Sequence, residues 1–419
     1  MSVFNRFYLV VAFVGLACLS VNGQAAYTPF SSFGIGDYYG NSLVHNQGMG
    51  GVGISNPQTW YLNNQNPALL VFNTLTSFSA GYLVDSRTIR NSSANEKNTN
   101  GNINYLVLGL PIKRGKWTTS IGMNPYTNVN YKLTYTQEIE NSVNTVDVTE
   151  TGAGGINQLS WSHGVAITRN ISVGLKANYY FSSIDRHFVN QLSQSASTLI
   201  IPSIHTRQHF SDFNLTGGLS IRKDSLFKKN YRFNFGVVYD FKTNIKTKYY
   251  EAVERNGTTI DTLANNEIRQ TTLPQTIAAG LSFGRPEYWT LGTDFTFLDY
   301  SQFRDINGSN SGTTQGWKWA VGAEVTPDPL SVSSYLKRMT YRTGVSLEKY
   351  PYLINGNTLQ DMSVNFGFSM PVSRVSNLDF AVKYGQRGDI KTNTVSEKYF
   401  KVSLGITFND QWFIKRRFD

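Results

Sequence analysis

The sequence predicts an all-β protein, namely a fourteen-stranded antiparallel transmembrane β-barrel with an N-terminal plug, or hatch, inside the lumen. Three observations support this class. Most of the chain consists of segments in which apolar and polar residues alternate, these segments number fourteen, and short turns alternate with long polar loops. Aromatic residues make up 14% of the 419 residues and charged residues only 16%, which excludes a disordered chain.

The first element, residues 1–23, is expected to be a cleaved signal peptide. Arg6 precedes a thirteen-residue apolar run, Phe7 to Leu19, and small residues follow it. A transmembrane helix needs roughly 20 apolar residues, so a helical membrane protein is excluded. The one cysteine, Cys18, lies in this segment, where the residues before it disfavour a lipoprotein. We therefore expect export through the periplasm to the cell outer membrane and a mature chain without disulfides.

The second element, residues 24–73, shows no sustained alternation and contains much Gly and Asn. A disordered periplasmic tail is one interpretation. However, large apolar residues such as Tyr38, Trp60 and Leu70 are numerous here, and they are unfavourable in water. The segment is therefore predicted to be a folded hatch within the barrel.

The third element, residues 74–408, is predicted to be the barrel. A soluble β-sandwich also alternates, but the strand lengths, their even spacing and the signal peptide favour a membrane barrel with its short turns facing the periplasm. The predicted strands are 74–90, 102–112, 117–138, 155–168, 171–189, 205–222, 231–252, 266–283, 288–303, 315–326, 338–348, 359–370, 377–388 and 397–408.

Every predicted strand carries a glycine on its inward parity, mostly about four residues from the short-turn end. Curvature of a closed sheet is one explanation for them. The other is a ring without side chains that leaves room for the hatch. The predicted ring consists of Gly81, Gly109, Gly122, Gly164, Gly174, Gly218, Gly236, Gly280, Gly292, Gly322, Gly344, Gly367, Gly385 and Gly405.

A resemblance to a known family begins in the predicted hatch. The segment Asn63 to Leu70, with Asn66, Pro67 and Ala68 at its centre, resembles the Asn-Pro-Ala segment that ends the hatch of the FadL family of outer-membrane hydrophobic-compound transporters. Short motifs at 294–303, 321–324 and 341–344 resemble later strands of that family. The ending, 384–388 and 405–415, resembles its Bacteroidetes branch, which includes PorV-like barrels of type IX protein secretion.

The resemblance implies passive uptake of a hydrophobic or amphipathic, fatty-acid-like molecule, with outer-membrane lipids as neighbours. The alternative that it leaves open is a non-transporting, PorV-like interaction barrel that docks other outer-membrane or secretion-complex proteins. A kinked third strand with a lateral window is a further property of the family. Asn124 and Pro125 lie at the matching place, where a proline cannot donate a ladder hydrogen bond. A bulge above the membrane is the other explanation for this proline.

Ionisable residues of both signs lie on the predicted inward parity. They are expected either to pair with each other and the hatch or to leave one cation free for a ligand carboxylate. The candidate lumen residues are Arg342, Lys318, Asp294, Glu324 and Asp240, and Arg342 and Lys318 are the first candidates for the free cation.

No catalytic arrangement, cofactor or metal site is predicted. Of the five histidines, His163 is interpreted as an interfacial residue, and His205 and His209 are expected to lie roughly 13 Å apart, too far to share a metal. The net charge of +10 raises the possibility of nucleic-acid binding. The basic residues gather at predicted short-turn ends and in a predicted periplasmic tail, 409–419, which favours lipid headgroups instead.

Overall fold

The structure, a computed structural model, describes residues 27–138, 145–192, 202–226, 230–310, 312–373 and 375–411. The predicted signal peptide, 1–23, lies outside the described residues. So does the part of the predicted tail from residue 412 onward, including its aromatic and basic residues.

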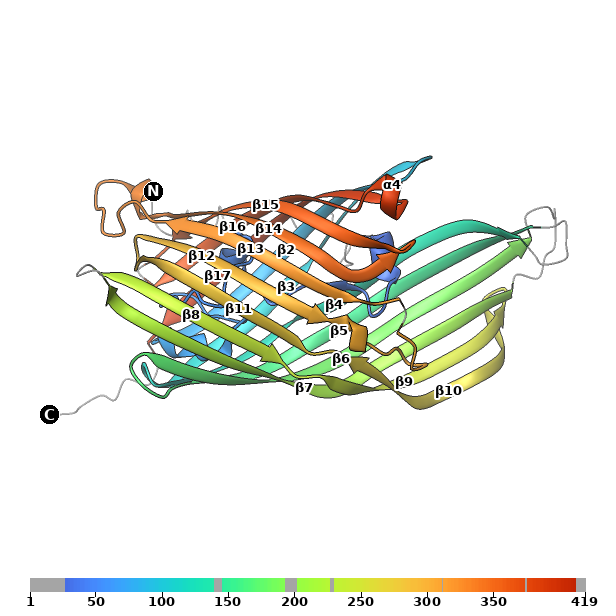
Figure 1. The fold of residues 1–419 in the computed structure, drawn as a ribbon, viewed down its shortest axis with the longest axis horizontal. Helices are drawn as coiled ribbons and strands as arrows, with labels where there is room; N and C mark the ends of the chain where they lie inside the picture. Colours follow the sequence, from blue (N-terminus) through green and yellow to red (C-terminus); the bar gives the residue numbers. More distant parts are fainter. Residues whose placement is uncertain are drawn as a thin grey trace.

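The chain forms a closed antiparallel barrel of fourteen strands, as the alternation predicts (Figure 1). A two-residue gap divides one barrel strand into β8 and β9, and a second gap, at Pro274, divides another into β10 and β11. The wall consists of β2 (Thr76–Arg90), β3 (Asn95–Lys113), β4 (Trp117–Glu138), β5 (Thr145–Ala166), β6 (Ile171–Leu192), β7 (Pro202–Leu226), β8 (Tyr231–Asp240), β9 (Thr243–Arg255), β10 (Thr258–Leu273), β11 (Thr276–Arg285), β12 (Trp289–Asp299), β13 (Gln315–Val325), β14 (Thr340–Ile354), β15 (Asn357–Pro371), β16 (Ser376–Arg387) and β17 (Ser396–Asp410).

The barrel closes between its first and last strands. β17 pairs with β2 without interruption, from Ser396 opposite Arg90 to Asp410 opposite Thr76. β17 therefore runs two residues beyond the predicted end at 408. The predicted strand 288–303 is too long, because β12 ends at Asp299 and the 3-10 helix η3 (Tyr300–Gln302) follows.

The wall is much taller on one side. The first part of β7 pairs with β9, and β9 pairs with β10, whereas the part of β7 near the short turns pairs with β8. Figure 1 shows this side extending well beyond the strands β12 to β14. The extension continues β4, β5 and β6, which are each 22 residues long, so it forms a half-cylinder on the long-loop side.

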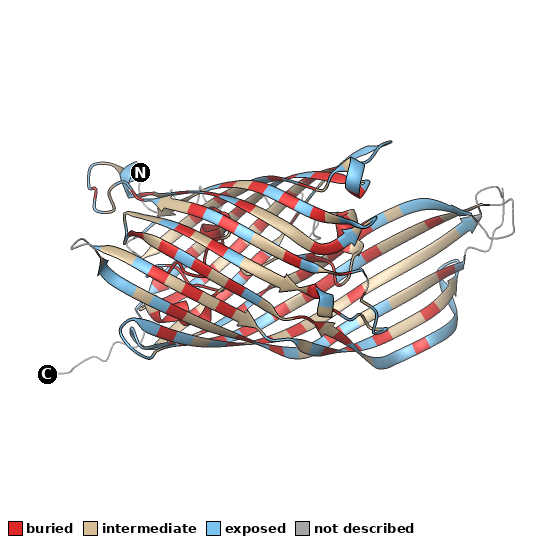
Figure 2. Ribbon diagram, in the orientation of Figure 1, coloured by how far each residue is buried: buried red, intermediate tan, exposed pale blue. Residues whose placement is uncertain are grey.

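Side chains alternate between the two faces of the wall, and Figure 2 shows buried and exposed positions following one another along the strands. The outward positions carry exposed apolar residues, for example Trp161, Leu291, Phe366 and Phe400. A belt of this kind is stable against hydrocarbon rather than water. No helix among the described residues is long and apolar enough to cross a membrane.

The segment before β2 lies inside the barrel (Figure 1). It contains η1 (Pro29–Ser32), β1 (Asp37–Tyr38), the single-turn helix α2 (Val44–Gln47) and the 3-10 helix η2 (Pro67–Phe72). Most of its apolar residues are buried, including Leu43, Met49, Leu62 and Leu70, whereas Tyr38 and Trp60 are 40% and 38% exposed. We call residues 27–73 the hatch.

The hatch rests on wall glycines, since a side chain at most of them would overlap it. A Cβ on Gly164, Gly174 or Gly218 would overlap Asn66, Pro67 or Ala68. Further round the wall, Gly236 meets Ile54, Gly322 and Gly344 meet Met49, and Gly405 meets Val44. Gly81, Gly122 and Gly385 face wall side chains instead.

On the long-loop side the lumen is filled by an apolar cluster to which both the hatch and the wall contribute. Its buried members include Ile35, Tyr180, Phe210 and Phe303. The lumen is thus packed by hatch and wall side chains along much of its length.

Candidate functional site

The Asn-Pro-Ala segment is anchored both to the rest of the hatch and to the wall. The Asn66 side chain caps η2, because its Oδ1 accepts a hydrogen bond from the backbone N–H of Ala68 at 3.0 Å. Its Nδ2 donates to the carbonyls of Ile54, at 2.8 Å, and Leu219 in β7, at 3.1 Å. One asparagine thus joins two hatch segments to the wall, and Pro67 fits the first helical turn because its missing N–H costs nothing there.

Four of the five candidate lumen residues hold the hatch or the wall together. Arg342 forms an ion pair with Glu324 at 3.1 Å, and Glu324 also accepts from Gln58 of the hatch at 2.8 Å. Asp294 accepts from the backbone N–H groups of Gly53 and Ile54 at 2.7 and 2.8 Å.

Asp240 stays within the wall, where it accepts from Thr276 at 2.6 Å. Because Arg342 is already paired and lies over the Tyr61 ring, it is not a free cation for a ligand.

Lys318 differs from the other four because it faces a cavity of about 90 Å³ between the hatch and the wall. Lys383 and Lys401 line the same cavity, opposite hatch residues Tyr38 and Tyr39. Lys401 lies 3.3 Å from Asp85. Lys318 and Lys383 have no carboxylate within ion-pair distance among the described residues.

Two of the three lysines are close for a structural reason. Lys383 in β16 and Lys401 in β17 are direct ladder partners and point to the same face of the sheet. Like charges in directly opposite positions destabilise a sheet unless something compensates them. Asp85 pairs with Lys401. Asp37 also lines the cavity but is paired with Arg87 and Arg387, and Glu348, the ladder partner of Lys318, is not within ion-pair distance of it. The lining thus has more ammonium groups than free carboxylates, which suits an anionic group.

A buried ion-pair network fixes the hatch next to this cavity. The hatch residue Asp37 accepts from Arg387 at 2.7 Å and from Arg87 at 3.2 Å, and both arginines also pair with Glu397. Thr28 of the hatch donates to Glu397 as well. We call Asp37, Arg87, Arg387 and Glu397 the latch. It binds the hatch to β2, β16 and β17.

On the other side of the β2–β3 hairpin the hatch meets a gap in the wall. The ladder between β3 and β4 ends at Leu106 opposite Met123, directly before Asn124 and Pro125. The remainder of β4 pairs with β5, through a bulge after Pro125, and has no β3 partner among the described residues.

The hatch covers the free edge of β4. The short strand β1 pairs with it, with Asp37 opposite Asn128, and the N–H of Tyr39 donates to the carbonyl of Tyr126 at 3.1 Å. A cavity of about 300 Å³ remains beside this edge, and its lining includes Pro125, Asn130, Asn157 and Tyr39. Tyr39 therefore separates the lysine cavity from the gap.

Four of the five histidines lie in the wall, and His45 lies in the hatch. His163 lies on the outer face between Trp117 and Trp161, as interpreted from the sequence, and accepts from the Trp117 indole N–H at 3.3 Å. His187 and His205 stack in the extension with ring centroids 4.0 Å apart, and burial followed by the neighbouring imidazole lowers the pKa of His187. Among the described residues, no group of three or more metal-binding side chains is present.

The sequence interpretation did not include the latch. Arg387 lies two residues after Gly385, on the same inward face, so parity alone could have identified it. Its pairing with Asp37 could not have been anticipated, because the hatch has no periodicity from which to infer a face.

A closed fourteen-stranded barrel, an apolar outer belt and an N-terminal segment inside the lumen define an outer-membrane type of β-barrel that is filled by its own N-terminal region. The chain belongs to the BamG family, whose family model matches residues 5–419.

Solved structures with a similar fold are FadL-family channels. A Pseudomonas aeruginosa FadL homologue is 11% identical, with 89% of this chain and 99% of that chain covered and a TM-score of 0.58. The Pseudomonas putida toluene transporter TodX is 13% identical, with coverages of 90% and 100% and a TM-score of 0.57. The Ralstonia pickettii toluene transporter TbuX is 13% identical, with coverages of 88% and 98% and a TM-score of 0.57.

At these identities the similarity is one of fold. The FadL resemblance expected from the sequence is therefore retained for the architecture, whereas the family to which the chain belongs is a different one. No curated protein sequence matches the chain.

Proposed function

We propose that this protein is an outer-membrane barrel for passive uptake of amphipathic small molecules that carry an acidic group, such as fatty acids. The observation that carries the proposal is the lysine cavity, where Lys318 and Lys383 lack an ion-pair partner among the described residues beside the hatch. A carboxylate there would gain charge-assisted hydrogen bonds and relieve the repulsion between Lys383 and Lys401.

The size of the cavity indicates how such a ligand would be held. Ligand pockets usually enclose roughly 300 to 1,000 Å³, whereas this cavity measures about 90 Å³. It accommodates an acidic head group but not a long apolar tail. The tail would need the space that Tyr38 and Tyr39 occupy, so binding requires a shift of the hatch.

The proposed exit is the lateral window at Asn124 and Pro125. The wall gap begins at these residues, and Tyr39 borders both the gap and the lysine cavity. A shift of β1 away from β4 would join the two spaces. The gap is lined by several asparagines, which suits an amphipathic molecule better than a purely apolar one.

The proposal is tested by uptake of a labelled fatty acid and of labelled toluene in cells with equal barrel abundance. Lys318→Gln and Lys383→Gln should lower fatty-acid uptake about tenfold, the usual worth of a charge-assisted hydrogen bond, and leave toluene uptake unchanged. Lys132→Gln, an exposed lysine of β4, is the matched control. Equal fatty-acid uptake in all variants would contradict the acidic-ligand proposal.

A second function, a PorV-like interaction barrel of the Bacteroidetes type, is favoured by a different observation. The link between β13 and β14 contains the short helix α3 (Tyr335–Arg338) and exposes Leu330, Val332 and Leu336, with 81%, 98% and 64% of their surfaces accessible. An apolar cluster on this link, at the short-turn end of the barrel, suits a protein partner. Replacement of Leu330 and Val332 by Ser should then abolish stoichiometric co-purification of that partner in mild detergent without altering uptake.

A further inference from the structure

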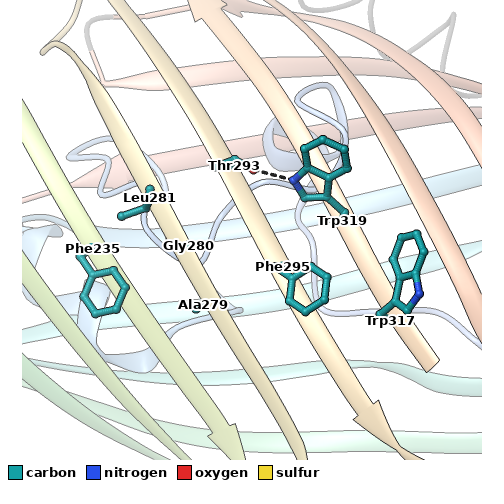
Figure 3. Close-up of a pocket in the computed structure, with 8 residues that line it drawn as sticks. All are labelled: Phe235, Ala279, Gly280, Leu281, Thr293, Phe295, Trp317 and Trp319. Atoms are coloured by element: carbon teal, nitrogen blue, oxygen red, sulfur yellow. Dashed lines mark hydrogen bonds between the residues drawn. The ribbon is translucent and has the colours of Figure 1, made fainter. Parts of the chain in front are cut away.

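The outer face of the barrel contains an apolar groove that is distinct from the lumen. Its volume is about 500 Å³, and it crosses β8, β11, β12 and β13 (Figure 3). Phe235 forms one wall, Phe295, Trp317 and Trp319 form the other, and Ala279 lies on the floor between them. None of these residues contributes to the lysine cavity or to the gap.

The ladder register explains the groove. Ala279 lies opposite Val237 on one side and Phe295 on the other, and Phe295 lies opposite Trp319. A row of large outward side chains is thus interrupted by one methyl group. The Trp319 indole N–H donates to Thr293 Oγ1 at 3.0 Å, which holds the ring upright as a wall.

The groove lies within the membrane belt. Outward aromatic residues form one girdle near the short turns, including Trp117, Tyr231 and Trp289, and another toward the long loops, including Tyr179 and Phe213. Aromatic girdles mark the two membrane interfaces of such barrels. The groove ends at Trp317, near the start of β13 on the long-loop side, so it opens to the leaflet on that side.

A cation lies at this open end. Lys349 in β14 is the direct ladder partner of Trp317 and shares its outward face. Its half-buried side chain has no ion-pair partner among the described residues. An apolar channel that ends at a lysine at the membrane interface matches a lipid, whose acyl chain is apolar and whose head group is anionic.

We propose that this groove is a binding site for one acyl chain of an anionic lipid in the long-loop-side leaflet. The aromatic walls enclose the chain, Ala279 makes room for it, and Lys349 pairs with the lipid phosphate. The site does not depend on transport through the lumen. Continuity of the groove with the lipid-facing belt favours a lipid over a side chain of another protein.

The test is native mass spectrometry of the barrel extracted from membranes in mild detergent. Ala279→Trp fills the groove and should lower the retained fraction of tightly bound lipid about tenfold, because several methylene groups lose their contacts. Ala177→Trp places the same side chain on the outer face of β6, opposite Trp161, and should leave retention unchanged. Lys349→Gln should lower retention of anionic but not of zwitterionic lipid.

Folding of each variant is verified by its heat-dependent migration in gels, and Ala279→Leu replaces the tryptophan variant if that variant fails to fold. Wild-type protein without retained lipid, or equal retention in the wild type and the Ala279 variants, overturns the proposal. A photo-crosslinker at Leu281 that captures a protein rather than a lipid overturns it as well.

Discussion

The two seams that flank the β2–β3 hairpin differ in how they are closed. Between β17 and β2, backbone pairing runs the full length of both strands. Between β3 and β4 it stops at Met123, and the hatch strand β1 occupies the place of the missing neighbour. The β17–β2 seam is closed by barrel strands alone, whereas the β3–β4 seam is closed in part by the hatch, which is not part of the barrel wall. A barrel can therefore leave an edge unpaired if its own N-terminal region covers it.

Removal of the hatch, which covers the free edge of β4, should change the barrel most. Deletion of Gln24 to Leu70 takes away β1 and most of the hatch contacts with the glycine-lined wall. We expect an open pore, measurable as a stepwise conductance in planar bilayers, where the full chain shows little. A correctly assembled deletion variant with unchanged conductance would show that residues 24–70 do not plug the lumen.

Substitution within the latch should have the next largest effect, on the stability of the barrel and its hatch. Arg387→Met leaves Asp37 and Glu397 short of a buried partner, and loss of one member of a buried ion pair typically costs about 3–5 kcal/mol. We expect a lower unfolding temperature, measured by heat-dependent migration in gels, and faster proteolysis of the hatch. Arg207→Met removes an ion pair with Asp185 from an arginine that is 53% exposed, and it should change stability by less than about 1 kcal/mol.

Two adjacent glycines give a matched test of the hatch contact. A Cβ on Gly218 would overlap Asn66, whereas a Cβ on Gly217 would meet only Phe241, at 3.8 Å. Gly218→Ala should therefore destabilise the barrel by about 1–3 kcal/mol through overpacking. Gly217→Ala should be neutral or slightly stabilising, since it only restricts the unfolded chain. Equal unfolding temperatures for the two variants would contradict the inferred hatch contact.

The smallest effect is expected at the open seam itself. Pro125→Val restores a backbone N–H where β4 has no β3 partner. If this edge then pairs with β3, uptake of labelled fatty acid should fall severalfold at equal barrel abundance. Thr134→Val, an exposed position further along β4, is the control. Unchanged uptake in the Pro125 variant would remove the proposed window from the mechanism.

The barrel could be predicted almost completely because membrane strands have a strict period of two. β4 has the predicted bounds, 117–138, and each of the other predicted strands overlaps a barrel strand of the structure, although β3 begins at Asn95 rather than 102 and β14 ends at Ile354 rather than 348. The extension was underestimated, since β5 begins at Thr145 rather than 155. The early residues of β5, which include three threonines, Asp147 and Glu150, lie on the half-cylinder, where alternation of polarity is weaker.

The candidate site was only partly predictable. Parity identified Lys318 as a residue of the lumen. It could not show that Arg342 is paired with Glu324, because cross-strand register depends on loop geometry. The sequence also could not predict that β1 pairs with the free edge of β4, because a strand of two residues is too short to show alternation.

The latch has a consequence for how the molecule is assembled. The hydrogen bond between Thr28 and Glu397 joins groups that are 369 residues apart, so the first described segment is fastened by the last strand. Contacts of such long sequence separation form late in folding. The contacts that fix the hatch can therefore form only after β16 and β17 have folded. Closure of the barrel between β17 and β2 and fixation of the hatch inside it are then expected to occur in the same step.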